Sequence, residues 1–372
     1  MVTMARAAIA AADRGSHPHT GLVLDRLLDQ WPEDQTQKGA AFVRFIANAC
    51  KLPVPEVYQA AYQRWYELIL QACTRREAAL WAGQVEGRLF IGTGGVSPLE
   101  AAVTLHHTYG TPFIPGSALK GLTRAYALER IEGSKRRVNA RTFDTLFGRE
   151  PETTDGDWDG GEAGYLIFNN AWWIPHSART PLTPEIVTVH HADYYSSQGT
   201  TPATDFDSPT PNAQIAVQGS FLFSIEGAGQ WAEFGMELLQ MALQHWGAGA
   251  KTGAGYGYFR EDDKTQREIQ ARRDQAERSA REIGMTENQK TIQTFIDCCQ
   301  KRMAELKGKK DKQNTGIHQQ ASKLVKDAAG WSSEEKQALA DAIREWLPQV
   351  VDLVNKEKET FKKMGILALE QP

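Results

Sequence analysis

The sequence predicts an α+β protein in which a mainly antiparallel sheet, with helices on one face, is flanked by helical segments at both ends. Three observations lead to this prediction. Apolar residues recur at helical spacing between about residues 22 and 81. Short runs rich in β-branched and aromatic residues alternate with two helical patterns between about 85 and 259. Beyond residue 260, charged residues become dense and glycines scarce, which is typical of exposed amphipathic helices.

The elements follow in order along the chain. The first segment repeats apolar residues at helical spacing in two groups, 24–31 and 58–69, separated by the turn LPVPE at 52–56. The central segment predicts strands at 88–92, 164–169, 186–189 and 220–225. It also predicts helices at 117–128, with Ser117 as the N-cap, and at 231–246. These patterns divide the chain into residues 1–84, 85–262 and 263–372.

The last segment differs from the rest in composition. Residues 261–372 hold 41 of the 88 charged residues but only five of the 32 glycines. Ser332 and Glu335 have the spacing of a capping box, which predicts the start of a helix. Two apolar faces are expected to bury each other in a separate helical module. The residues expected on those faces are Leu339, Ile343, Trp346, Leu347 and Val350 on one side, and Ile292, Phe295, Ile296 and Met303 on the other.

Composition narrows the functional classes. The formal net charge of −4 excludes a bulk positive field, so any RNA contact must come from a local basic patch. The four cysteines form no C-x-x-C pair, which favours free thiols in a reducing compartment over disulfides or zinc. No stretch is apolar for long enough to span a membrane. A cytoplasmic protein without membrane partners, metal or cofactor is therefore expected.

The first glycine-bearing motif, YGTPFIPGSALKGLTR at 109–124, is predicted to be a turn that opens a helix. Gly116 lies in the turn, and Ser117 is followed by the first free N–H groups of the helix. Lys120 and Arg124 are four residues apart and so share one helical face. This combination suits a phosphate group. An ordinary capped surface helix remains the alternative.

The second motif, GAGAKTGAGYGY at 247–258, holds five glycines with Lys251 and Thr252 at its centre. Ala250 stands where a Walker A loop requires glycine, and the spacing does not fit a dinucleotide fingerprint, so a nucleotide cofactor is not expected. Gly249, Gly253, Gly255 and Gly257 would let a nucleic-acid backbone approach closely. A flexible turn that packs against its own fold remains the alternative.

Taken together, the two motifs resemble the RAMP superfamily of CRISPR-associated proteins. Within it, the chain is most similar to the family of sixth subunits of type III-B Cmr effector complexes, over roughly residues 85–260. The matching segments are RLFIGTG at 88–94, LHHTYG at 105–110, FNNAWW at 168–173, VTVHHADYYS at 187–196, DSPTP at 207–211 and AKTGAGYG at 250–257.

The resemblance implies a ferredoxin-like, RRM-like RAMP domain and a non-catalytic structural subunit in antiviral defence. It implies guide CRISPR RNA, target RNA and other Cmr subunits as partners, with a place near the 3′ end of the guide. The expected RNA-binding residues are Gly116, Ser117, Lys120, Arg124, Gly249, Lys251, Thr252, Gly253, Gly255 and Gly257.

Other side chains leave alternatives open. A RAMP-family endoribonuclease that processes CRISPR RNA would need a general base, for which His106, His107, His190 and His191 are the candidates. His190, His191 and Asp193 could also be metal ligands, but local hydrogen bonding is the simpler interpretation. The long polar stretch at 196–212 is expected to be a hairpin or thumb that wedges between RNA segments or subunits. Trp172 and Trp173 are expected in a core or interface, with base stacking as the alternative. A pure protein–protein adaptor is the third functional class.

Overall fold

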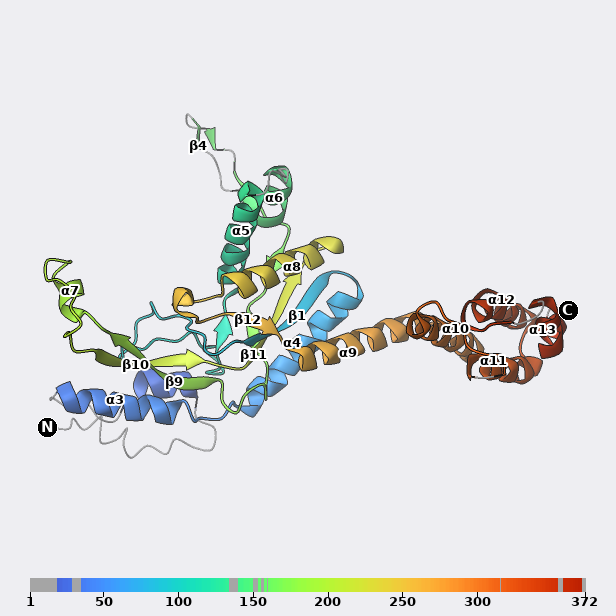
Figure 1. The fold of residues 1–372 in the computed structure, drawn as a ribbon, viewed down its shortest axis with the longest axis horizontal. Helices are drawn as coiled ribbons and strands as arrows, with labels where there is room; N and C mark the ends of the chain where they lie inside the picture. The colour runs from blue at the N-terminus through green and yellow to red at the C-terminus, as the bar shows by residue number, and fades with distance from the viewer. Residues whose placement is uncertain are drawn as a thin grey trace. The chain divides into compact units, whose positions relative to one another are not determined.

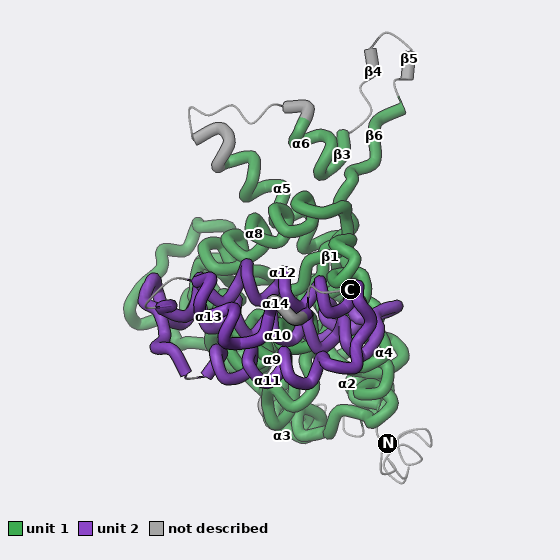
Figure 2. Tube along the Cα trace, turned by 90° about the vertical axis from the view of Figure 1, so that its right-hand side faces the viewer, with its two compact units in different colours: residues 1–274 green, residues 275–372 purple. Residues whose placement is uncertain are grey.

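The structure, a computed structural model, describes residues 19–28, 35–133, 140–149, 153–154, 157–158, 160–314, 316–353 and 357–369. The chain divides into two compact units, residues 1–274 and 275–372, which are coloured separately in Figure 2. Within the described residues, no helix is long and apolar enough to cross a membrane.

The main sheet of the first unit has six strands in the described part of the chain. Its order is β12 (Phe259–Glu261), β1 (Ala78–Val85), β11 (Ser220–Glu226), β8 (Ala171–Trp173) and β2 (Phe113–Ile114), with β7 (Ile167–Phe168) also paired to β11. Every pairing is antiparallel. The register of the central pair runs from Ala78 opposite Glu226 to Gln84 opposite Ser220.

Three helices cover this sheet. α5 (Gly116–Gly133) and α8 (Gln230–His245) lie side by side, and α8 packs against β1, β11 and β12 (Figure 1). α4 (Glu56–Thr74) also packs against β1. All but the last residue of β11 are buried, as expected for a strand covered on both faces. The prediction of a mixed helix-and-sheet domain is therefore confirmed, but the expectation of helices on one face of the sheet is wrong, because the central strands are buried on both faces.

Strand β1 was not predicted. Its residues read AALWAGQV and are buried on both faces, so the two-residue alternation of a half-exposed strand is missing. The predicted helical segment ends at Thr74 instead of about 81, and the predicted division after residue 84 falls at the end of a central strand. The segment predicted as a strand at 88–92 forms only the isolated bridges of Leu89 with Val217 and Phe90 with Ala250.

A two-stranded hairpin carries the polar stretch that was expected to form a thumb. β9 (Leu182–Val189) pairs with β10 (Thr210–Val217), and the short helix α7 (Ala192–Ser196) lies in the connection at its tip (Figure 1). α3 (Gln35–Ala49) packs along both strands and also contacts α2 (Thr20–Arg26).

The remaining elements of the first unit are short. α6 (Ala140–Phe147) leads into β3 (Gly148–Arg149), which pairs with β6 (Glu162–Ala163). β4 (Thr153–Thr154) pairs with β5 (Asp157–Trp158). A 3-10 turn, η1 (Thr252–Ala254), lies inside the glycine loop.

The second unit is helical in its described residues. Its helices are α10 (Glu287–Leu306), α11 (Gly316–Asp327), α12 (Ser333–Val350), α13 (Glu357–Met364) and α14 (Ile366–Leu369). α10 and α12 pack together around Phe295, Leu339 and Ile343, which are fully buried. The two predicted apolar faces therefore meet, except that Met303 remains 41% exposed.

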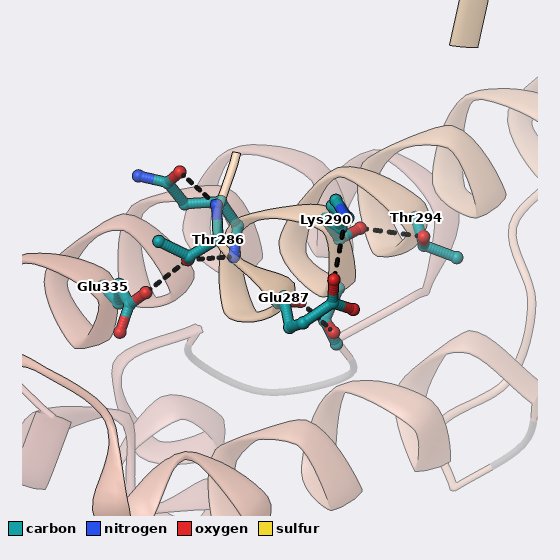
Figure 3. A network of polar contacts seen from close by, with 7 residues as sticks. Thr286, Glu287, Lys290, Thr294 and Glu335 are labelled. Carbon is teal, nitrogen blue, oxygen red and sulfur yellow. Dashed lines mark hydrogen bonds and ion pairs between the residues drawn. The ribbon is translucent and has the colours of Figure 1, made fainter. Parts of the chain in front are cut away.

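Both of these helices begin with a capping box, one at Thr286 and Gln289 and the other at Ser332 and Glu335. The Glu335 carboxylate also accepts a hydrogen bond from Thr286 Oγ1, which Figure 3 shows, and another from Asn288 Nδ2, so it links the starts of the two helices.

Helix α9 (Asp263–Glu282) crosses the division between the units. Its first turns belong to the first unit, because the Gln266 side chain accepts a hydrogen bond from the Ala82 backbone and Ile269 is buried. Asp262, just before the helix, accepts a hydrogen bond of 2.7 Å from Ser220 Oγ. The compact unit therefore continues to Asp274, beyond the division predicted after residue 262.

Candidate nucleic-acid interface

The glycine loop is fixed at its base by hydrogen bonds to its own fold. Ala248 N–H donates to the Gly257 carbonyl, Gly257 N–H to the Arg88 carbonyl, and Ala250 N–H to the Phe90 carbonyl. The Phe90 ring also contacts Tyr256, with centroids 4.7 Å apart. These contacts leave a tip of a few residues that projects from a rigid base.

The predicted loop glycines serve two different purposes. A Cβ at Gly249 would lie 2.0 Å from the Phe90 carbonyl oxygen, and one at Gly257 would lie 2.0 Å from that of Ala248. At these two positions the close approach is made by the protein's own backbone. Gly253 and Gly255 have no atom within 4 Å of an added Cβ and are exposed. They are therefore the glycines of the loop that leave room for an external strand.

Lys251 lies at the tip of this loop in the left-handed region, with φ of 62°, and its side chain is exposed. Thr252 follows it and starts the 3-10 turn. Since the first residues of a helical turn have no acceptor within that turn, their N–H groups point outward. The loop thus presents one cation next to free backbone donors.

The start of α5 differs from the prediction. The helix begins at Gly116, so Ser117 lies inside the first turn instead of capping it. Asn170 Oδ1 accepts a hydrogen bond of 2.8 Å from Gly116 N–H and so takes over the capping role from a distant segment. A Cβ at Gly116 would lie 2.0 Å from the Phe168 carbonyl oxygen. Asn170 belongs to the FNN segment at 168–170, but no local spacing links it to residue 116.

The two predicted cations of α5 line a cleft of about 660 Å³. Ser117, Lys120 and Arg124 lie on its α5 side, and the Arg124 guanidinium is 5.2 Å from the centre of the Phe143 ring. Arg149, which the sequence did not single out, and Glu162 also line it. Three cations against one carboxylate make this cleft suitable for a phosphate backbone.

The glycine loop lies on the side of α5 opposite the cleft that Lys120 and Arg124 line. Ala118, Leu119 and Leu122 line a second hollow of about 750 Å³ together with the glycine loop. At 100° per residue these positions face away from Lys120 and Arg124. The structure therefore arranges the predicted residues as two groups on either side of the first turns of α5: Gly116, Ser117, Lys120 and Arg124 on one side, and Gly249, Thr252 and Gly253 on the other.

The hairpin tip carries exposed aromatic side chains. Phe206 is 99% exposed and Tyr195 is 68% exposed, and Tyr194 packs edge-on against Tyr195. Asp207 accepts hydrogen bonds from Thr204 Oγ1 and from His191 Nδ1, at 2.7 and 2.9 Å. These hydrogen bonds lower the pKa of the Asp207 carboxyl to about 2. Local hydrogen bonding thus accounts for His191.

The other candidate side chains take part in packing. Trp173 is buried, while Trp172 is half-buried between Tyr58 and Trp65, with centroids 5.6 and 5.2 Å away. Burial lowers the pKa of His106, whose ring contacts Trp172. Within the described residues, no group of three or more His, Cys, Asp or Glu side chains could hold a metal ion.

Comparison with known proteins identifies the domain that holds these groups. Residues 84–260 match the RAMP superfamily. The chain carries a RAMP superfamily domain. It is 26% identical over 254 residues to the CRISPR system Cmr subunit Cmr6 of Pyrococcus furiosus, a match that spans 56% of this chain and 75% of that protein. The predicted resemblance is therefore confirmed, and the RAMP superfamily match at 84–260 includes both α5 and the glycine loop.

Two solved structures with similarity to the chain are of Cmr proteins. A chain of a type III-B Cmr-beta complex bound to cognate target RNA is 17% identical, with a TM-score of 0.45 over 62% of this chain and 76% of that chain. Crystalline Cmr6 from Pyrococcus furiosus is 25% identical, with a TM-score of 0.30 over 50% of this chain and 97% of that chain.

Proposed function

We propose that this chain is a non-catalytic, guide-RNA-binding structural subunit of a type III-B CRISPR RNA-targeting complex, located near the 3′ end of the guide RNA and acting in antiviral defence. The Cmr6-like sequence of the RAMP domain carries the proposal. Its partners would be guide RNA, target RNA and other Cmr subunits. A cytoplasmic location belongs to the same proposal, since the four cysteines are free thiols that such a compartment keeps reduced.

A ferredoxin-like fold is part of the proposal. The main elements follow the order β1, α5, β8, β11, α8 and β12, and the strands lie in the order β12, β1, β11, β8. That is a βαββαβ arrangement with the fourth strand beside the first and the third between the first and second. The start of α5 and the loop after α8 then lie near one another, because both flank the cavity of about 750 Å³.

The RNA backbone is proposed to cross the first turns of α5 and contact both groups. Lys120, Arg124 and Arg149 line the cleft on one side, and Lys251 projects from the loop on the other. Phosphate contacts hold a strand in place without reading its sequence, which suits a subunit that must accept guides of any sequence.

Salt dependence of RNA binding tests this proposal. Replacing Lys120 and Lys251 by Ala should weaken binding equally for unrelated single-stranded sequences. It should also reduce the slope of log affinity against log salt by about 0.7 for each phosphate that is no longer neutralised. Lys51→Ala is the matched control, because Lys51 is exposed on the same unit and lines neither hollow. A slope that stays unchanged in the double variant would contradict direct phosphate binding.

The endoribonuclease alternative is favoured by one observation: Asp207 holds His191 at 2.9 Å on the hairpin tip, as an oriented general base would be held. Incubating the chain with labelled CRISPR repeat RNA, with and without divalent metal, separates the two functions. The complete complex carrying Ala at Asp193, Asp205 and Asp207 should still cut target RNA. If that complex assembles but loses cleavage at any site, the non-catalytic assignment is wrong.

A further inference from the structure

The hollow between α5 and the glycine loop lies beside the proposed path of the RNA backbone. Its volume is about 750 Å³, within the range of small-molecule pockets. Ile91, Ile114 and Leu119 form an apolar floor, and the half-buried Trp246 lines its side. None of the residues that line it carries a carboxylate, an ammonium or a guanidinium group. A neutral, mainly apolar pocket of this size suits an uncharged planar group.

Most polar side-chain groups of the pocket can either donate or accept a hydrogen bond. They are the hydroxyls of Thr104, Thr252 and Tyr258 and the imidazole of His245, whereas the indole N–H of Trp246 can only donate. None of the three hydroxyls has a hydrogen-bond partner in the part of the chain that the structure describes. His245 Nδ1 lies 3.0 Å from the Tyr126 hydroxyl, and its ring stacks on Tyr126. That contact fixes the ring and leaves Nε2 of this pocket-lining residue free to bind a ligand.

We infer that this pocket binds the base of a single unstacked RNA nucleotide, with the phosphate remaining outside near Lys251. The inference rests on the proposed RNA-binding function and names the nucleotide that the glycine loop holds. Lys251 directly precedes Thr252, which lines the pocket, so one nucleotide can contact both. Recognition of unstacked bases by aromatic and apolar side chains is a general mode of single-stranded RNA binding. Trp246 supplies the aromatic surface.

The same chemistry predicts little preference among bases. Hydroxyl and imidazole groups adapt to either a donor or an acceptor on the base edge, whereas a fixed amide or guanidinium would not. His245 then acts as a binding residue. The sequence concealed this role because residue 245 continues the apolar stripe of α8 through Phe234, Leu238 and Met241.

NMR spectra of isoleucine methyl groups test the inference. Adding a short oligouridylate or oligoadenylate to the full chain should shift the δ-methyl resonances of Ile91 and Ile114. The δ-methyl resonances of Ile292 and Ile343 in the second unit should not shift. RNA carrying 4-thiouridine at successive positions should cross-link to residues 245–253 from one position only.

Ala118→Trp is the decisive variant. Ala118 is exposed and lines the pocket, so a Trp there fills it with little risk to the fold. The variant should lose the Ile91 shift and the cross-link, yet keep the salt slope of RNA binding. Ala125→Trp is the control, since Ala125 is exposed on the same helix face two turns further along and lines neither hollow.

The outcomes separate this inference from the proposed function. Salt-dependent RNA binding by the unaltered chain without Ile91 or Ile114 shifts would overturn the pocket and leave the RNA-binding role intact. Equal effects of the two Trp variants would also overturn it. No RNA binding at all would overturn both. A methyl shift produced by a subunit of the complex in the absence of RNA would show that a protein side chain fills the pocket instead.

Discussion

The two compact units specify their structures by different means. In the first unit, the decisive contacts join residues far apart in the sequence, such as Gly116 with Asn170 and Gly249 with Phe90. In the second, each of the two main helices closes its own start with a capping box, at Thr286 and at Ser332. In the first unit, loops are therefore held by residues far away in the sequence. In the second, helix ends are capped by residues three positions away.

In the second unit, the positions of acidic and basic residues suit the directions of its two main helices. Thr286 at the start of α10 contacts Glu335 at the start of α12, and Lys310 after α10 donates to the Pro348 carbonyl near the end of α12. The two helices thus run parallel. Acidic residues lie at their starts and lysines follow α10, which offsets the aligned helix dipoles. Lys310 therefore has a structural role that requires no ligand.

Truncation should give the largest effect and tests where the first unit ends. A chain ending at Arg260 lacks three stabilising interactions: Asp262 with Ser220, Gln266 with the Ala82 backbone, and the burial of Ile269. Removing each of them costs roughly 1–3 kcal/mol, a large share of a typical stability of about 5–15 kcal/mol. Residues 1–274 should melt cooperatively by circular dichroism, and residues 1–260 should not.

The control for this truncation is the complementary fragment. Residues 275–372 should melt independently as a helical unit, since they form their own buried cluster. Equal melting temperatures for fragments 1–260 and 1–274 would show that α9 contributes nothing to the first unit.

Substitutions in the glycine loop should have the next largest effect. Gly249→Ala combines a positive φ of 81° with a blocked Cβ, and we expect a loss of roughly 3 kcal/mol in unfolding free energy. Gly255→Ala has the positive φ alone and should lose about 1 kcal/mol. Gly253→Ala has neither constraint and should be close to neutral. Denaturant melts of the three variants measure this order, and equal losses would refute the division of the loop into base and tip.

The contrast between local and long-range contacts also explains which elements could be predicted from the sequence. The capping box at Ser332 and the buried faces around Phe295 and Leu339 could be predicted because helical contacts lie three or four residues apart. Strand β1 could not, because burial on both faces removes the alternation that marks a strand. The capping of Gly116 by Asn170 was equally hidden, since 54 residues separate the partners.

The sequence proposed residues for the candidate site but not their arrangement. Local patterns singled out Lys120, Arg124 and the loop glycines as candidates, whereas their placement on two sides of α5 depends on the pairing of distant strands. Met303 was predicted from helical spacing to lie on a buried face of α10. That face is not covered along its whole length, so Met303 remains 41% exposed.

The smallest expected effect concerns pH and the second unit. Hydrogen bonds from Thr286, shown in Figure 3, and from Asn288 lower the pKa of the Glu335 carboxyl from 4.5 to about 2. Because the folded state holds this group ionised more strongly than the unfolded chain does, its stabilising contribution is fully present above about pH 4.5. It is lost progressively as pH falls towards about 2. The melting temperature of residues 275–372 should therefore fall over this range.

Comparison of variants isolates the contribution of Glu335 to this fall in melting temperature. Glu335→Gln removes the ionisable group. Because Thr286 and Asn288 donate to different oxygens of Glu335, the amide keeps an acceptor for only one of them. The variant should melt lower than the unaltered fragment near neutral pH, and the difference should shrink as the solution is acidified. Arg302 also lowers the pKa of Asp311 by hydrogen bonding, so both fragments keep a residual acid dependence. Glu334→Gln, at the neighbouring exposed position, should leave the profile unchanged. If the gap between Glu335→Gln and the unaltered fragment stays constant from neutral to acid pH, the carboxylate does not join the two helices through its charge.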